Sequence, residues 1–106
     1  MKTVVAITHG YPPKWNMGGE VSLHRMLKTA RGDKHVLTTT DKEHIFEGVQ
    51  IHKINAKNVL DIKTDPNPIA KQLRDLKADV VIGQNELSLA AVIAARMIGA
   101  VSIVSV

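Results

Sequence analysis

The stretch THGYPPKWNMGGE, at residues 8–20, decides the fold of this chain. An apolar run at residues 2–8 leads into it, and an amphipathic helical pattern follows at residues 21–30. Its two adjacent prolines can neither continue a strand nor lie inside a helix, while Gly18 and Gly19 allow the backbone to approach a ligand closely. We therefore predict a long loop between a first strand and a first helix, which is where an open α/β sheet binds its ligand.

Length and composition indicate one small domain over residues 1–106, with 44% hydrophobic and 23% charged residues. The chain has no cysteine, which excludes disulfides and thiolate metal ligands and fits a cytoplasmic location. It shows neither the apolar core of a signal peptide nor a membrane span, since Arg96 and Gly99 interrupt its most apolar region at residues 87–106. The net charge is +4, but basic and acidic residues alternate and aromatic residues are few, so nucleic acid is not an expected partner.

Strand and helix patterns alternate along the rest of the chain. They predict strands at residues 2–8, 34–40, 49–54, 79–83 and 101–106, and helices at residues 19–30, 67–77 and 87–98. This order indicates an α/β protein, namely a Rossmann-like three-layer α/β/α domain with a five-stranded parallel sheet in the strand order 3-2-1-4-5. The switch point then lies between the first and fourth strands, where the long loop meets the turn Gln84-Asn85-Glu86.

The segments between these elements give weaker patterns. Asn67 is expected to cap the second helix at its N-terminus, with Pro68 at the first helical position. Ile45 and Phe46 are expected to contact the core just before the third strand. Residues 55–65 are ambiguous, with a short helical turn as one interpretation.

Gly18 and Gly19, together with the start of the first helix and nearby Lys14, predict an anion-binding site. Exposed N–H groups and the helix dipole at this point suit a phosphate or a sugar hydroxyl. The alternative is that the two glycines only allow a sharp turn into the helix. The pattern is neither the dinucleotide fingerprint GxGxxG nor a phosphate-binding P-loop.

Five other residues of the two predicted loops are candidates for ligand contacts. His9 is either a hydrogen-bonded scaffold residue or a catalyst, and Tyr11 and Trp15 either stack on a sugar or seal the core beneath the loop. Asn85 and Glu86 either bind hydroxyl groups or cap the third helix. The spacing of the five histidines indicates no metal site, and neither a metal nor a cofactor is assigned.

Four sequence segments resemble the N-terminal domain of GT-B glycosyltransferases of family 4. They are YPP at residues 11–13, GG at residues 18–19, HVLTT at residues 35–39, and DVVIGQN at residues 79–85 followed by SLAAVIAAR at residues 88–96. The resemblance covers nearly the whole chain. It implies the acceptor-side domain of an enzyme that transfers a sugar from a nucleotide-sugar donor to an acceptor in a cleft between two Rossmann-like domains.

By this resemblance, Gly18 and Gly19 face the donor diphosphate, and residues 84–86 border the acceptor. The sequence departs from the family in carrying no histidine after the last strand, and in reading Gln84-Asn85-Glu86 where a histidine is common. We expect a truncated domain that is inactive alone and that pairs with a missing C-terminal domain or forms a homo-oligomer. The alternatives are a non-catalytic interaction or assembly module and a small independent α/β enzyme.

Overall fold

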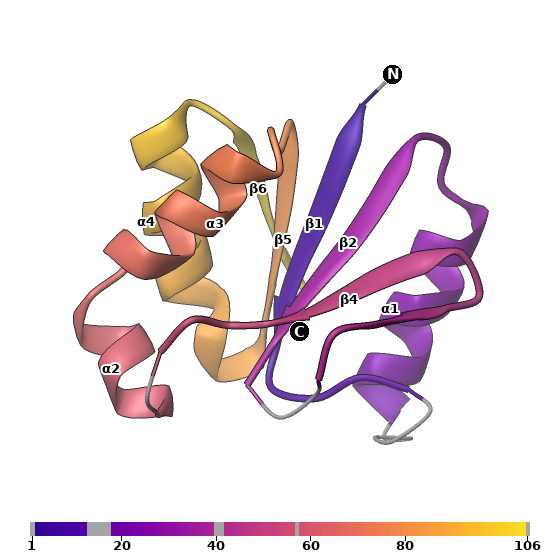
Figure 1. Cartoon of the computed structure of the whole chain (residues 1–106), viewed down its shortest axis with the longest axis horizontal. Helices are drawn as coiled ribbons and strands as arrows, with labels where there is room; N and C mark the ends of the chain where they lie inside the picture. Colours follow the sequence, from indigo (N-terminus) through magenta and orange to yellow (C-terminus); the bar gives the residue numbers. More distant parts are fainter. Residues whose placement is uncertain (1, 13–17, 40–41, 57, 106) are drawn as a thin grey trace.

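A computed structural model describes residues 2–12, 18–39, 42–56 and 58–105 of the chain (Figure 1). The strands are β1 (Thr3–Thr8), β2 (Asp33–Thr38), β3 (His44–Phe46), β4 (Val49–Lys53), β5 (Val80–Gln84) and β6 (Val101–Ser105). The helices are α1 (Gly18–Thr29), α2 (Val59–Thr64), α3 (Asn67–Asp75) and α4 (Ser88–Ile98), with a 3-10 helix, η1 (Asn85–Leu87), between β5 and α4.

The strands form one mixed sheet in the order β3-β4-β2-β1-β5-β6. β1 pairs in parallel with both β2 and β5. β4 and β6 extend the parallel part on either side, while β3 is antiparallel to β4. The chain is therefore an α/β protein, and its strand order reverses between β1 and β5.

The prediction of a five-stranded, wholly parallel sheet was wrong, because a sixth, antiparallel strand lies at one edge and changes the order of the sheet. The five predicted strands, which are β4, β2, β1, β5 and β6, keep the order 3-2-1-4-5 relative to one another. Residues 44–46 form an additional edge strand that turns back into β4 through Glu47 and Gly48. Both turn residues have positive φ, 49° and 83°, as the tight two-residue hairpin turns require. Phe46 packs against the core as expected, whereas the expectation for Ile45 was wrong, because its side chain is 73% exposed on this edge strand.

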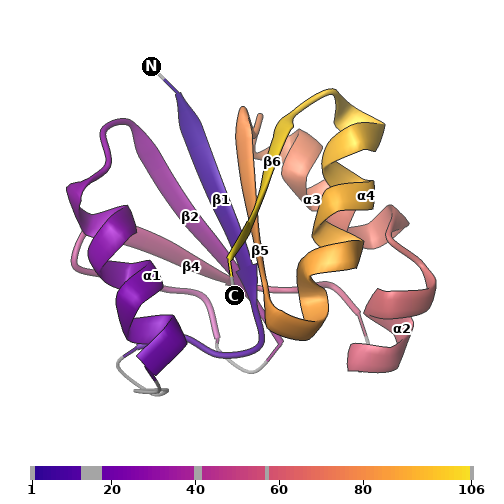
Figure 2. The ribbon, with the colours of Figure 1, turned by 180° about the vertical axis from the view of Figure 1, so that it is seen from behind.

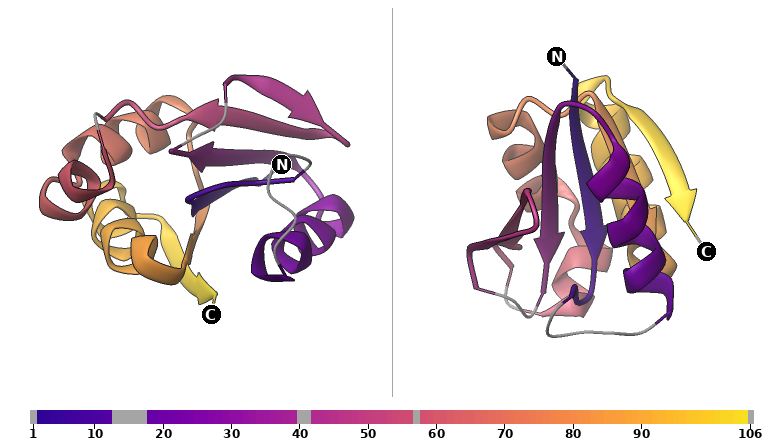
Figure 3. Two further views of the ribbon diagram at one scale, coloured as in Figure 1. Left: turned by 90° about the horizontal axis from the view of Figure 1, so that it is seen from below. Right: turned by 90° about the vertical axis from the view of Figure 1, so that its right-hand side faces the viewer.

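Helices cover both faces of the sheet, so the structure has three layers. Figure 3 shows α1 on one side and α2, α3 and α4 on the other. Val5, Ala6 and Ile7 of the central strand are fully buried and point alternately to the two sides. The α1 side is filled by Ala6, Tyr11, Leu23, Leu27, Val36, Val49, Ile51 and Ile82. The continuous apolar run of β1 is therefore that of a strand covered on both faces, as predicted.

The start of α3 differs from the sequence expectation. The N-cap of α3 is Pro66, and the Asp65 carboxylate accepts hydrogen bonds from the backbone and side-chain N–H groups of Asn67. Asn67 is therefore the first helical residue, because the local Asx-type bonds place the turn one residue earlier.

Within the described ranges, no helix is long and apolar enough to cross a membrane.

Gly32 joins α1 to β2 at a position that excludes any side chain. Its φ is +98°, and a Cβ atom there would lie 2.1 Å from the carbonyl oxygen of Lys2. Gly48 also has positive φ, but a Cβ atom there would meet nothing within 4 Å.

We expect each Gly→Ala change to lower the free energy of unfolding by about 1–2 kcal/mol, because alanine is strained in the left-handed backbone. Gly32→Ala should lower it by about 1–3 kcal/mol more, because the backbone must shift. Urea unfolding of both variants checks this, and equal losses would contradict it.

Candidate functional site

The carboxyl ends of β1 and β5 and the start of α1 lie at the same end of the molecule (Figure 2). Gln84, the last residue of β5, is 1% exposed. Its side chain lies beneath Gly19, because a Cβ atom at Gly19 would be 2.7 Å from Gln84 Nε2. The absence of a side chain at residue 19 therefore lets the first turn of α1 rest on the end of β5.

The amide of Gln84 is the unusual group at this point. Neither its Nε2 nor its Oε1 has a hydrogen-bond partner among the described residues. Buried polar groups in folded proteins are nearly always paired, and an unpaired one costs about 1–3 kcal/mol. Residue 84 was expected in a polar turn that borders the acceptor by resemblance to family 4, but it was not among the individual candidates for ligand contacts. The signal was available, since residue 84 continues the alternation of β5 and so points to the same face as Ile82.

The first turn of α1 provides the second half of this candidate site. Gly18 and Gly19 open a 12-residue helix, whose first N–H groups lack intrahelical partners and carry the positive end of the helix dipole. Gly19 is exposed, so ligand atoms can reach the backbone there. Lys14 and Trp15, which the sequence analysis also selected, lie outside the described residues.

Tyr11 belongs to the core, as one of its two predicted roles required. It is fully buried, its hydroxyl shares a 2.7 Å hydrogen bond with His24 Nδ1, and the two rings meet edge to face. His24 stacks on Phe46 with ring centroids 4.8 Å apart, and its Nε2 lies 3.5 Å from a Glu47 carboxylate oxygen. Burial, followed by the charge of Glu47, raises the pKa of Tyr11 well above its ordinary range. Tyr11 therefore anchors the loop to α1 and is not available for sugar stacking.

The hairpin turn between β3 and β4 is tied to the same helix. Lys28 Nζ lies 2.6 Å from the Glu47 carboxylate, and the hydrogen bond from Lys28 lowers the pKa of that carboxyl. Glu47 is thus shared between Lys28 and His24, both on α1. This arrangement ties α1 to the turn between β3 and β4.

His9 connects the ends of two neighbouring strands. Its Nδ1 lies 2.6 Å from Thr39 Oγ1, and its carbonyl oxygen accepts hydrogen bonds from the backbone N–H and the hydroxyl of Thr39. These contacts join the chain leaving β1 to the chain leaving β2. They match the scaffold role that the sequence analysis weighed against a catalytic one.

Neither Asn85 nor Glu86 occupies the N-cap position of α4. The N-cap of that helix is Leu87, without a side-chain cap bond, because the 3-10 turn η1 separates β5 from α4. Glu86 is exposed and its carboxylate lies 3.3 Å from Lys63 Nζ of α2. The capping alternative was therefore wrong, and Glu86 pairs with the helix layer opposite α1.

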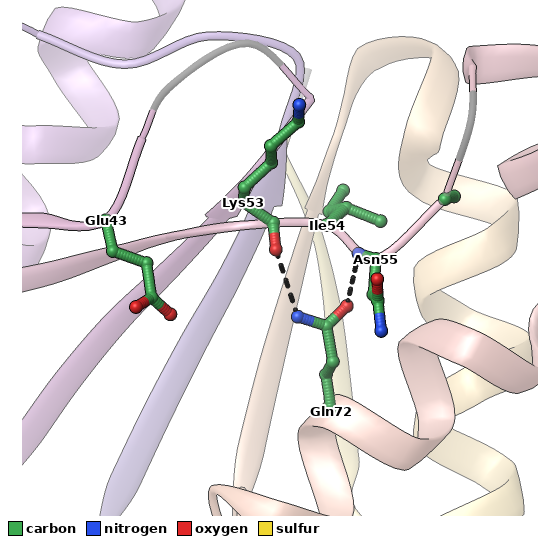
Figure 4. Close-up of a pocket in the computed structure, with 6 residues that line it drawn as sticks. Glu43, Lys53, Ile54, Asn55 and Gln72 are labelled. Carbon is green, nitrogen blue, oxygen red and sulfur yellow. Dashed lines mark hydrogen bonds between the residues drawn. The ribbon is translucent and has the colours of Figure 1, made fainter.

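A hollow of about 540 Å³ lies elsewhere, at the carboxyl end of β4 (Figure 4). Gln72 of α3 forms part of its wall, donating from Nε2 to the Lys53 carbonyl oxygen and accepting at Oε1 from the Asn55 N–H. Both ends of its amide are engaged in joining α3 to the chain after β4. We favour the switch point as the ligand site because Gln84 is buried with its hydrogen-bonding capacity unused, whereas Gln72 is structural.

Two histidines on β2 and β4 form a stacked pair. The rings of His35 and His52 lie 5.2 Å apart, with Nδ1 of His35 3.0 Å from Nε2 of His52. Glu43 Oε1 lies 3.3 Å from Nδ1 of His52. Burial, followed by the charge of His52, lowers the pKa of His35 against the smaller opposing effect of Asp33. Among the described side chains, no three His, Asp or Glu residues are placed to hold a metal ion.

Comparisons of the chain with protein-family models, with curated proteins and with solved structures find no match. The function is therefore argued from the geometry of the switch point, together with the resemblance of the four sequence segments. Two of those segments fall on this geometry, since residues 18–19 begin α1 and residues 79–85 contain β5.

The lowered pKa of His35 predicts how stability depends on pH. The folded protein binds a proton at His35 less readily than the unfolded chain does, where the pKa of this residue is near 6.5. The contribution of neutral His35 to the free energy of unfolding is therefore fully present above pH 6.5. It is lost as pH falls through the lower folded value. We expect His35→Gln to show a smaller loss of unfolding free energy than the parent between pH 7.5 and 5. His44→Gln, at an exposed position, is the control, and an unchanged pH dependence in His35→Gln would contradict the prediction.

Proposed function

We propose that this chain is a Rossmann-like acceptor-side domain of the GT-B glycosyltransferase type, which binds a nucleotide-sugar and its acceptor at the switch point. The observation that carries the proposal is the contact between Gly19, at the start of α1, and Gln84, at the end of β5. Open α/β sheets bind ligands where two such loops meet. The resemblance of both segments to family 4 supports the same place.

The chemistry of the first turn of α1 fits the diphosphate of a donor. Free backbone N–H groups and the helix dipole favour an anion at this position without any charged side chain. The net charge of +4 on the chain adds a general attraction for anionic ligands. Sugar transfer itself requires groups that surround the reacting bond and stabilise its developing charge. In such enzymes a second domain supplies part of that environment, so the proposed role of this chain is to bind and orient.

Gly19→Ala tests the proposed site with little risk to the fold. Alanine is favoured over glycine in a helix by about 1 kcal/mol, but its methyl group would lie 2.7 Å from Gln84 Nε2 and displace the amide. We expect affinity for UDP-glucose or GDP-mannose, measured by calorimetry, to fall roughly tenfold, about 1.4 kcal/mol. Ser22→Ala, at an exposed position of the same helix, is the control. The proposal fails if the parent binds neither nucleotide-sugar or if Gly19→Ala binds as tightly as the parent.

A second candidate function is a homo-oligomeric assembly module. The observation in its favour is a set of apolar side chains, each 40–70% exposed, at Leu89, Ile93 and Met97 of α4 and Val101, Ile103 and Val104 of β6. Within the described ranges, β6 pairs only with β5. Its sequence, VSIVS, contains neither the charges nor the proline with which natural proteins protect a sheet edge.

Substitution at the sheet edge tests this second candidate. Ile103→Lys places a charge on β6, whereas Ile45→Lys places the same charge on β3, at the opposite edge. If β6 joins two copies of the chain, sedimentation analysis shows a dimer for the parent and Ile45→Lys, and a monomer for Ile103→Lys. A monomeric parent at high concentration, or a dimer that survives Ile103→Lys, would count against it.

A further inference from the structure

We infer that His35, His52 and Glu43 form a pH-sensitive clasp, which holds the open end of the β3–β4 hairpin against β2 at neutral pH and releases it in acid. Its basis is a chain of two hydrogen bonds. Nδ1 of His35, on β2, lies 3.0 Å from Nε2 of His52, on β4. Nδ1 of His52 lies 3.3 Å from Oε1 of Glu43, which precedes β3. The clasp is separate from the switch point, and its operation does not depend on the proposed function.

The clasp closes the end of the hairpin that lies opposite its turn. β3 is antiparallel to β4, so Glu43, just before β3, comes next to His52, near the end of β4. At the turn, Glu47 is bonded to Lys28 of α1, and the hydrogen bond from Lys28 lowers the pKa of this carboxyl. The turn therefore stays attached to α1 in mild acid, and the open end alone responds to the histidines.

The carboxylate of Glu43 fixes the hydrogen positions along the chain of bonds. An ionised carboxylate can only accept, so Nδ1 of His52 carries a hydrogen and donates it. In neutral His52 the other nitrogen, Nε2, is then bare and accepts from the Nδ1–H of His35. The 3.0 Å contact takes up most of the 5.2 Å between the ring centroids, so both nitrogens lie in the gap between the rings. This gap holds a single hydrogen.

The pair of rings can take up one proton intact, but not two. The first proton adds to Nε2 of His35, which is bare in this arrangement, and both hydrogen bonds remain. Its charge passes to His52, beside Glu43, when the hydrogen in the gap moves across. The last free lone pair then lies in the gap, so a second proton must enter there. Two N–H groups on positively charged rings would face each other, and the contact would break.

The surroundings of the pair set the direction of the pH response. His35 is 7% exposed, and burial, followed by the charge of His52, lowers its pKa. Negative charge comes from Asp33, which opposes this shift, and from Asp75 of α3, which lines a hollow with His52. His44 of β3 lines another hollow with His52 and adds positive charge when protonated. The clasp is therefore fully stabilised above pH 6.5 and weakens as pH falls through the lower folded value of His35.

Opening of the clasp would alter two hollows beside β4. Glu43 lines both the hollow of about 540 Å³ at the carboxyl end of β4 and a hollow of about 280 Å³ that also contacts α3. When the rings separate, Glu43 and His52 move together, away from His35. Acid thus displaces one wall of both hollows, while the strands on the other side of β2 keep their pairing.

Nitrogen-15 NMR of the imidazole rings tests the hydrogen positions in the parent protein. At pH 8 we expect Nδ1–H and a bare Nε2 on both His35 and His52, the opposite of the tautomer that free histidine prefers. A hydrogen on Nε2 of neutral His52 would overturn the inference, because Glu43 could not then accept from Nδ1. This measurement needs no variant.

Amide hydrogen exchange at pH 7.5 and pH 5 tests the release. After correction for the intrinsic pH dependence, we expect the amides of β4 to open roughly tenfold more often in acid, relative to those of β1. His35→Gln retains a donor to His52 but cannot take up a proton, so this response should disappear. Glu43→Gln retains an acceptor without the charge and should enlarge the response. His44→Gln, which removes a histidine bonded to the Lys42 carbonyl oxygen, should respond as the parent does.

Three exchange results would overturn the inference. The first is a parent whose β4 amides open equally at both pH values. The second is equal acceleration in β1 and β4, which would make the response global. The third is a full acid response in His35→Gln. If His35→Gln does not fold, the ring tautomers of the parent and the response of Glu43→Gln decide.

Discussion

The contact between the first turn of α1 and the last residue of β5 is the interaction on which the candidate site depends. It exists because residue 19 has no side chain and because Gln84 points to the α1 face of the sheet. One element supplies backbone N–H groups and a helix dipole, and the other supplies a buried amide with both ends unused. Neither would indicate a ligand site alone, because helix starts are common and single unpaired groups occur in many proteins.

The surrounding structure holds these two elements in register. β1 lies between β2 and β5, so its position fixes both neighbours. At one end, the Asp79 carboxylate accepts a hydrogen bond from the backbone N–H of Thr3, joining β5 to β1. At the other, Tyr11 and Glu47 fasten α1 through His24. The site is thus placed by buried contacts rather than by the loops alone, which is the condition for a preorganised binding geometry.

The features that could be predicted from the sequence are those that local residue patterns determine. The apolar run of β1 and the periodicity of the helices gave the α/β class and the meeting of the first and fourth predicted strands. It missed β3, because three residues joined by a tight hairpin turn give too short a pattern. It left the role of Tyr11 open, because the partner that buries its hydroxyl, His24, lies 13 residues away on another element. It placed Gln84 in a turn beside the acceptor but did not single it out, because an unused hydrogen-bonding capacity appears only when all possible partners are placed in space.

The most direct test is a two-dimensional 15N NMR titration of the protein with UDP-glucose. Gly19 and Gln84 lie on different elements and touch only through the proposed site. The account predicts that the largest shifts occur together at the backbone amides of residues 18–20 and at the side-chain amide of Gln84. Shifts confined to the hollow around Gln72 and Asn55, or an unchanged Gln84 side-chain signal at saturation, would contradict it.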